Sequence, residues 1–134
     1  DRSVSRGLGD VYKRQLQEDP TFNGTRKGVT HLNSCTKEER DALIKENPAY
    51  GSIVCRCEMI TEGEILDAIH RPLGATTLDG IKRRTRAGMG RCQAGFCSPR
   101  QIEILARELG VDQSEIRKSG RDSKFIVGTP KDRL

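Results

Sequence analysis

The sequence predicts a small, mostly helical domain with cysteine-bearing loops and at most one short strand pair, preceded by a linker arm. Three observations carry this prediction: helix-capping residues stand ahead of several short amphipathic segments, the cysteines lie between those segments, and the apolar content is low. Hydrophobic residues make up 34% of the 134 residues, and Trp is absent. A chain of this length is expected to hold one compact domain, and so thin a core is expected to need a metal, a disulfide or a partner surface for stability.

The first two predicted helices each begin at a capping box. Thr36 precedes Glu39, and Thr61 precedes Glu64, at the spacing this motif requires. The hydroxyl then accepts a hydrogen bond from the amide of the third helical residue, and the carboxylate accepts one from the amide of the cap. The first helix is expected to end before Pro48, because proline disfavours helical backbone in the residue ahead of it. The second helix is expected to bury an apolar stripe formed by Ile65, Leu66 and Ile69.

Two further helices are predicted in the second half of the chain. Thr77 is expected to cap a helix over residues 78–86, and Gly88 is expected to end it in the left-handed conformation. Ser98 is expected to cap the next helix, with Pro99 in its first turn, where the missing amide hydrogen costs nothing. The apolar face of this last helix consists of Ile102, Leu105, Ala106 and Leu109.

The segment after the last long helix is expected to be mostly irregular. Gly110 is expected to end that helix, and the pair Asp112 and Glu115 indicates one more short turn. The stretch Lys124–Val127 has strand character, and we expect it to pair with Ser52–Val54.

Composition and motifs divide the chain into four segments. We interpret residues 1–15 as a non-native tail, because they resemble translated sequencing-adaptor sequence and no initiator Met precedes them. Residues 16–50 are expected to form a linker with a short helix. The domain itself is expected over 51–128, followed by a C-terminal tail at 129–134.

The positive charge of the chain does not indicate a nucleic-acid partner. The formal net charge is +5, but residues 1–15 hold four basic and two acidic side chains, so the rest of the chain carries +3. The basic predicted helix 78–86 could imitate a DNA-binding element, yet aromatic residues for base stacking make up only 4% of the chain. We expect no nucleic-acid partner.

The sequence also bears on location. It contains no signal peptide and no apolar run of membrane-spanning length. We therefore expect a cytoplasmic protein with reduced thiols, attached to a membrane only through a partner.

Paired cysteines are the strongest functional signal. Cys55 and Cys57 are separated by one residue, and Cys92 and Cys97 by four. Soft thiolates select zinc or iron–sulfur clusters over hard cations, so these four residues are the expected metal and cofactor ligands. Zinc sites more often use Cys-x2-Cys pairs, which favours an iron–sulfur cluster but leaves a structural zinc-binding docking module as the alternative.

The remaining candidate ligands are isolated in the sequence. We expect Cys35 to be a free thiol, because it has no paired neighbour. His31 and His70 also stand alone, so a Rieske-type site with two histidines is excluded, and His70 is expected to interact with the dipole at a helix end. We predict no catalytic residue in the chain.

The surroundings of the second cysteine pair suit an anionic cluster. Gly88, Gly90 and Gly95 permit close backbone approach and can present N–H groups to sulfur. Between residues 80 and 102 there is no acidic residue. The same stretch contains six basic residues, namely Lys82, Arg83, Arg84, Arg86, Arg91 and Arg100. These cations would favour the reduced, more negative form of a cluster, although a solvated helix face or a docking site for an acidic partner explains them equally well.

Three motifs resemble one known family. They are Val54-Cys55-Arg56-Cys57-Glu58, Thr61-Glu62-Gly63-Glu64-Ile65 and the run from Lys82 to Cys97, which contains Arg-Arg-Thr-Arg-Ala-Gly-Met-Gly-Arg-Cys-Gln. Together they resemble the BFD-like (bacterioferritin-associated ferredoxin-like) [2Fe–2S]-binding domain. The version here is similar to the one at the C-terminus of FAD-dependent oxidoreductases of the anaerobic glycerol-3-phosphate dehydrogenase type. The small ferredoxin of the family has Cys-x2-Cys as its second pair, and the longer spacing here weakens any transfer of ferritin-related function.

The resemblance implies a function for the chain. It implies that Cys55, Cys57, Cys92 and Cys97 bind a [2Fe–2S] cluster that passes electrons from reduced flavin to an acceptor. The chain is too short for a flavin domain and lacks a complete nucleotide-binding glycine motif. We therefore expect a non-catalytic fragment, whose partners are the FAD-bearing domain of the same parent chain and an acceptor protein or quinone-linked subunit.

Overall fold

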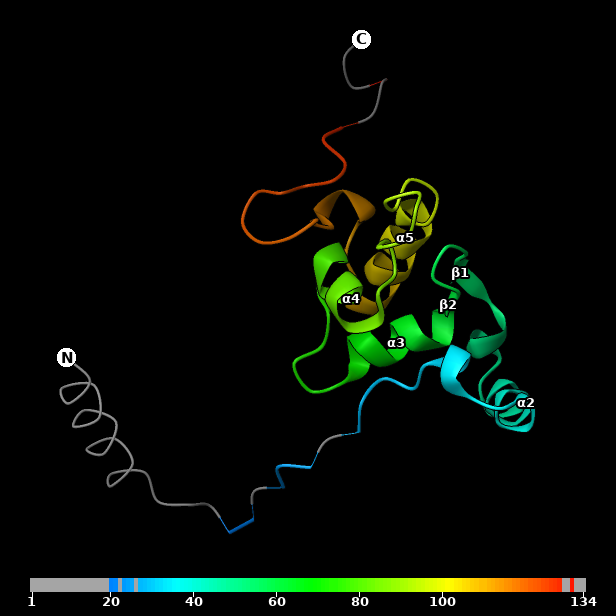
Figure 1. Cartoon of the computed structure of the whole chain (residues 1–134). Helices are drawn as coiled ribbons and strands as arrows, with labels where there is room; N and C mark the ends of the chain where they lie inside the picture. The colour runs from blue at the N-terminus through cyan, green and yellow to red at the C-terminus, as the bar shows by residue number, and fades with distance from the viewer. Residues whose placement is uncertain (1–19, 22, 26, 129–130, 132–134) are drawn as a thin grey trace, which may run out of the picture.

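The computed structural model describes residues 20–21, 23–25, 27–128 and 131, and it confirms the mostly helical prediction. Figure 1 shows the helices gathered into one body, with a single small sheet at its edge. The elements in chain order are η1 (Leu32–Ser34), α2 (Lys37–Glu46), η2 (Pro48–Gly51), β1 (Ile53–Cys55), β2 (Ile60–Thr61), α3 (Glu62–His70), α4 (Leu78–Thr85), α5 (Ser98–Leu109) and η3 (Gln113–Glu115), where η denotes a 3-10 helix.

Both predicted capping boxes are present. Thr36 accepts a hydrogen bond from the amide of Glu39, whose carboxylate accepts one of 2.8 Å from the amide of Thr36. Thr61 and Glu64 make the same reciprocal pair at the start of α3. Each box satisfies amide groups that the first helical turn would otherwise leave unpaired, which fixes where the helix begins.

The predicted ends of two helices were wrong by one or two residues. The N-cap of α5 is Cys97 and not Ser98, whose buried side chain lies inside the first turn. Helix α4 ends at Thr85, and the left-handed residue after it is Arg86, with φ of 70°. Gly88 also has positive φ, but it lies later, in the turn that leads to the cysteine loop.

The predicted pairing of Lys124–Val127 with Ser52–Val54 was also wrong. Strand β1 pairs with β2, antiparallel, through the four-residue turn 56–59. A strand so near in the sequence needs little loop closure, so the local partner prevails over one at the far end of the domain. Lys124 instead makes an isolated bridge with Arg117.

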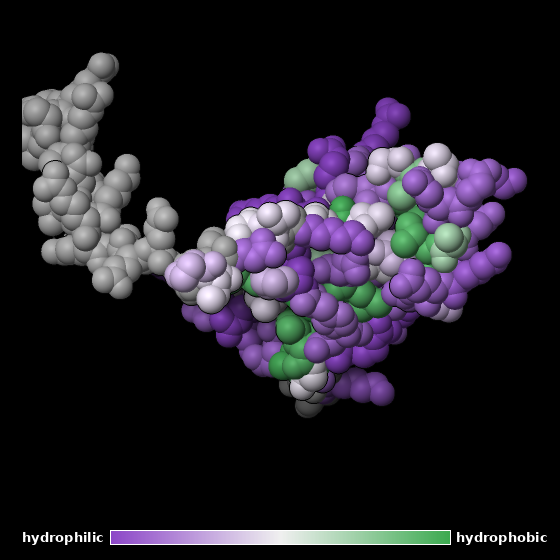
Figure 2. Space-filling view, turned by 90° about the horizontal axis from the view of Figure 1, so that it is seen from below, coloured by the Kyte–Doolittle hydropathy of each residue, from purple (hydrophilic) through white to green (hydrophobic). Residues whose placement is uncertain are grey.

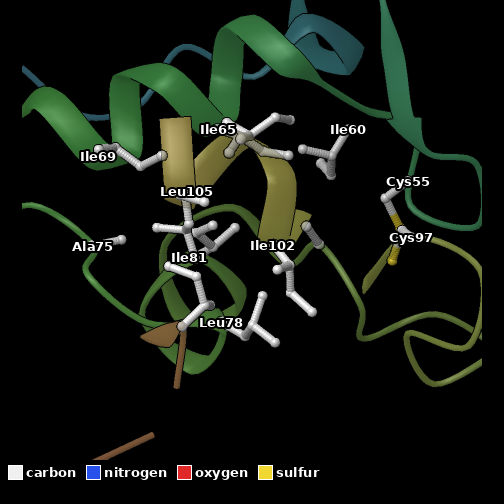
Figure 3. Packing of buried hydrophobic residues seen from close by; sticks show 14 residues of the cluster. Cys55, Ile60, Ile65, Ile69, Ala75, Leu78, Ile81, Cys97, Ile102 and Leu105 are labelled. Carbon is white, nitrogen blue, oxygen red and sulfur yellow. The ribbon is translucent and has the colours of Figure 1, made fainter. Parts of the chain in front are cut away.

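The core lies where α3, α4 and α5 meet. Figure 3 shows isoleucine and leucine side chains from the three helices pointing toward one another, with Cys55 and Cys97 at the edge of the cluster. The buried cluster consists of Cys55, Ile60, Ile65, Ile69, Ala75, Leu78, Ile81, Ala87, Cys97, Ile102, Ile104, Leu105, Ala106 and Ile116. Burying each large aliphatic side chain contributes about 1.5–3 kcal/mol, so this cluster supplies most of the stability of the domain.

The segment ahead of β1 is attached to the domain by polar contacts. The Nδ1 atom of His31 lies 3.2 Å from Oε1 of Glu64, the same carboxylate that caps α3. The ring of Tyr50 is buried and lies close over Gly63, where a Cβ atom would clash with it. Tyr50 also donates a hydrogen bond to Asp67, and burial together with this carboxylate raises the pKa of the phenol well above its ordinary value.

The outer surface is largely polar. Seen from below, the molecule is mostly hydrophilic, and its hydrophobic residues form small separate patches (Figure 2). Within the described part of the chain, no helix has the length and apolar character needed to span a bilayer. The tail prediction for residues 1–15 lies outside the described residues and stays a prediction, as do the other segment boundaries.

Candidate metal centre

All four paired cysteines line one cavity. Cys55 ends β1, Cys57 lies in the turn that follows, and Cys92 and Cys97 belong to the loop between α4 and α5. The cavity has a volume of about 620 Å³. Its other lining residues are Ile53, Val54, Arg56, Phe96 and Arg100. Two loops that are far apart in the sequence therefore bring four thiols to one place.

The four thiols fall into two pairs that differ in burial. Cys55 and Cys97, here called the inner pair, are 1% and 3% exposed, and Figure 3 shows their sulfurs pointing toward one another. Cys57 and Cys92, the outer pair, are exposed and half-buried respectively. A thiol–thiol hydrogen bond joins the members of each pair.

Burial and hydrogen bonding shift the thiol pKa values in opposite directions. Burial, with a smaller contribution from Cys55, raises the pKa of Cys97 to about 11. The hydrogen bond from Cys57 lowers the pKa of Cys92, and backbone amides of Phe96, Ala94 and Gly95 act in the same direction. Of the two cysteines in the loop between α4 and α5, Cys92 is thus the one that more readily becomes anionic without a metal.

The backbone around Cys92 forms a small anion-binding nest. Gln93 and Ala94 both have positive φ, of 48° and 69°. This unusual pair turns the following amides toward the Cys92 sulfur, since successive N–H groups converge in such conformations. The glycine-rich loop was expected to present N–H groups to sulfur. The amides of Phe96 and Ala94 do so, whereas the Gly95 amide mainly donates to the carbonyl oxygen of Cys92, at 3.0 Å.

One glycine permits the two cysteine loops to approach each other. A Cβ atom added to Gly90 would lie 2.2 Å from Cβ of Cys57, which is far inside contact distance. Any side chain at this position would push the turn 56–59 away from the loop of Cys92. Because Gly90 has no side chain, the two loops can approach closely enough for Cys57 and Cys92 to form the outer pair.

Gln101 is a functional residue that the sequence interpretation missed. Its buried Nε2 group donates a hydrogen bond of 3.0 Å to the sulfur of Cys97. Gln101 stands one helical turn after Cys97, and an i to i+4 relationship with an N-cap cysteine is a signal that could have found it.

A buried carboxylate positions the helix behind the cysteines. Glu62, at the start of α3, accepts hydrogen bonds of 3.0 Å from Arg100 and 2.9 Å from Arg107, both on α5. Burial favours the protonated form of Glu62, but the two guanidinium groups outweigh burial and lower its pKa. This ion-pair network was not predicted, although His70, expected only as a helix-end residue, extends it through a 2.8 Å contact with Glu108.

The expected basic surround is only partly brought to the site. Of the six basic residues between 80 and 102, Arg100 alone lines the cavity, where Arg56 joins it. Arg86 pairs with Glu58 at 2.9 Å, and Arg84 donates to the carbonyl oxygens of Gly80 and Leu73. Arg84 and Arg86 therefore serve local structure, and the basic stretch supplies one residue, Arg100, to the lining of the cavity.

Other candidate ligands lie elsewhere. Cys35 does not line the cavity, and its sulfur contacts the carbonyl oxygen of His31. Across residues 27–128 and the few described positions outside them, no three His, Cys, Asp or Glu side chains converge tightly enough to share a single metal ion.

A segment of the chain matches a known family. Residues 53–107 match the family described as the BFD-like [2Fe-2S] binding domain. This segment of the chain belongs to that family. The matched segment begins at β1 and ends within α5, so the BFD-like domain includes both cysteine loops and the core helices that carry them.

The chain matches only a part of each of several larger proteins. The chain is 49% identical to a glycerol 3-phosphate dehydrogenase of Caloramator mitchellensis, over 96% of this chain and 28% of the relative. It is 39% identical to one subunit of the anaerobic glycerol-3-phosphate dehydrogenase of Escherichia coli K12, over 49% of this chain and 12% of the relative. One subunit of the opine oxidase of Rhizobium meliloti is 41% identical, over 67% of this chain and 16% of the relative. No solved structure matches the chain.

The residues of the BFD-like domain fit an iron–sulfur cluster. Four unbridged thiols surround one cavity, amides point at one sulfur, an amide side chain donates to another, and Gly90 leaves the space that two close loops require. Thiolates with N–H donors to sulfur are the ligand environment of such clusters. Neither the match nor this donor set favours the zinc alternative.

Proposed function

We propose that Cys55, Cys57, Cys92 and Cys97 hold a [2Fe–2S] cluster, and that the chain is an electron-transfer module of an FAD-dependent dehydrogenase of the glycerol-3-phosphate dehydrogenase type. The observation that carries the proposal is the meeting of four thiols at one cavity inside the segment that matches the BFD-like family. When bound, the cluster supplies one-electron chemistry.

The side chains around the cavity have separate tasks in this proposal. The inner pair fixes two ligands in the packed core, so their positions are set before the cofactor arrives. The amides of Ala94, Gly95 and Phe96 and the side chain of Gln101 would stabilise negative charge on sulfur.

The flavin belongs to the parent enzyme in this proposal. The chain spans between 12% and 28% of the length of the three relatives described above, so most of each relative lies outside the region it matches. We infer that a flavin-bearing domain lies in that larger part and donates electrons to the cluster, and that an acceptor protein or quinone-linked subunit receives them. Paired cysteines that serve as cluster ligands and not as disulfides are typical of a reducing compartment, which supports a cytoplasmic location, with any membrane attachment supplied by a partner.

Reconstitution tests the proposed cofactor. The purified chain, treated anaerobically with ferrous iron and sulfide, is expected to bind two irons and two sulfides per chain and to give a paramagnetic signal after dithionite reduction. Cys35→Ser should behave like the wild type, because Cys35 lies outside the cavity. A colourless product that binds zinc in preference to iron would refute the proposal and restore the zinc alternative.

A further inference from the structure

The face around the outer pair combines exposed apolar side chains with unpaired positive charge. Phe96 is 89% exposed, although it lies between Cys92 and Cys97 and lines their cavity. Ile53, which also lines the cavity, is 47% exposed. Neither residue belongs to the core cluster or packs against it, so the fold of the domain does not explain their apolar character.

The charges on this face leave it positive. Arg56 lines the cavity, Arg91 directly precedes Cys92, and both are exposed without an ion-pair partner among the described residues. In the same described part of the chain, no carboxylate lines the cavity. Glu58, the nearest acid in sequence, is already paired with Arg86. A surface of carboxylates around an apolar recess is the complement of such a face.

The outer pair forms the exposed edge of the site. The inner pair lies against the packed core, so an electron that approached the site from behind Cys55 and Cys97 would have to cross that core. Figure 1 shows the arm before α2 running beneath α3. Asn33 of this arm donates a 3.2 Å hydrogen bond to the carbonyl oxygen of Glu58, but none of the described residues of the arm lines the cavity. Electron transfer slows steeply with the distance between two centres, and a partner therefore gains most by approaching Cys57 and Cys92.

We propose that this face is the docking site for an acidic surface of the flavin-bearing domain inferred above, with Phe96 as its apolar anchor and Arg56 and Arg91 as its charged rim. The inference rests on the proposed function, and it assigns the surface across which the electron passes. With the cluster bound, each transfer would take one electron from the reduced flavin of that domain and would reduce one ferric ion held by the cysteines to ferrous. An aromatic anchor within a ring of charges is the arrangement that concentrates binding energy at protein interfaces.

Stopped-flow reduction of the reconstituted full chain tests the anchor. Reduced flavodoxin, an acidic flavoprotein, is the probe that stands in for the flavin-bearing domain, and the bleaching of the cluster absorbance is the signal. Phe96→Glu is expected to lower the second-order rate by at least about tenfold, and Phe96→Ser by about threefold to fivefold. Leu73→Glu is the matched control, because Leu73 is 85% exposed but does not line the cavity, and its rate should equal that of the wild type.

Charge and salt test the rim with the same probe. Arg56→Gln and Arg91→Gln should each lower the rate and flatten its decline with added salt. Arg83→Gln, which removes an exposed arginine of α4 that lies outside the cavity lining, should leave both unchanged. Dithionite needs no docking surface, so it should reduce every variant at the wild-type rate.

Two failures can be told apart. If the wild-type chain forms no iron–sulfide chromophore, the proposed function is refuted and the docking site with it. If the chromophore forms but Phe96→Glu reacts with flavodoxin as fast as the wild type does, the docking proposal alone is refuted.

Discussion

The inner and outer cysteine pairs sit in opposite environments within one site. Cys55 and Cys97 are part of the hydrophobic core, whereas Cys57 and Cys92 lie in turns that face solvent. The inner pair is held by packing of whole helices, and the outer pair by backbone amides and a missing side chain at Gly90. The comparison shows that the position of the inner pair depends on the stability of the fold, whereas the position of the outer pair depends on local backbone conformation.

Removal of the cofactor is expected to have the largest effect on stability, because both cysteine pairs lose their ligand at once. Stripping iron and sulfide from the reconstituted chain is expected to lower the free energy of unfolding by about 3 kcal/mol or more, because cofactor binding to the folded state stabilises a small core. Urea unfolding of the loaded and stripped forms measures the difference. Equal midpoints would show that the inner pair is stable without its ligand.

Glu62→Gln tests how α5 is held behind the inner pair. We expect a loss of about 2 kcal/mol, because the variant removes the charged acceptor that Arg100 and Arg107 share. Glu103→Gln is the matched control: Glu103 also pairs with Arg100, at 2.7 Å, but it is 51% exposed, so its loss should cost less than about 0.5 kcal/mol.

The same variant carries a pH signature. Since the folded-state pKa of Glu62 lies below its ordinary value of 4.5, its contribution is fully present above that value and is lost as pH falls through the lowered pKa. The stability difference between wild type and Glu62→Gln should therefore be constant from neutral pH down to about 5 and shrink below 4.5. A difference that grows on acidification would contradict the assignment.

Serine substitutions in the stripped protein compare the pairs directly. Cys97→Ser places a hydroxyl in the core and is expected to cost about 1–2 kcal/mol. Cys92→Ser changes a half-buried loop position and should cost less than about 0.5 kcal/mol. Thermal unfolding without metal measures both, and equal losses would remove the distinction between the pairs.

The smallest expected effect is on the reduction potential. Gln101→Leu removes the hydrogen bond to Cys97, and since this bond favours the more negative reduced state, the potential should fall by about 40 mV for a bond of about 1 kcal/mol. Gln93→Leu is the control, because Gln93 donates to the carbonyl oxygens of Met89 and Gly90 and contacts no sulfur. A redox titration in which both variants behave alike would make Gln101 a packing residue.

Features that depend on residues close together in the sequence could be predicted, and features that depend on distant residues could not. The capping boxes at Thr36 and Thr61 were predictable because both partners lie within one helical turn. The strand partner of Ile53–Cys55 was not, since several apolar segments could have served and only the turn 56–59 decides. For the same reason the network of Glu62 with α5 escaped prediction, because its partners lie 38 and 45 residues away.

The candidate site likewise combines features that the local sequence predicts with features that depend on distant contacts. The paired spacing of the cysteines indicated a shared centre, and the structure brings all four to one cavity. Their unequal burial could not be predicted, because it depends on which loop residues meet the packed helices. The expected role of the basic stretch was too broad for a related reason: its residues are spread over α4, the loop after it and α5, and of the six only Arg100 lines the cavity.

The burial of Cys55 and Cys97 has a consequence for the rate of electron transfer. Atoms fixed in a close-packed interior resist displacement when the charge of a neighbouring group changes. The two cysteine ligands held in the core would then move little when a bound cluster changes oxidation state, which would lower the reorganisation energy of each electron exchange. A rigid anchor on one side would thus let the centre gain and lose electrons quickly even at a small driving force.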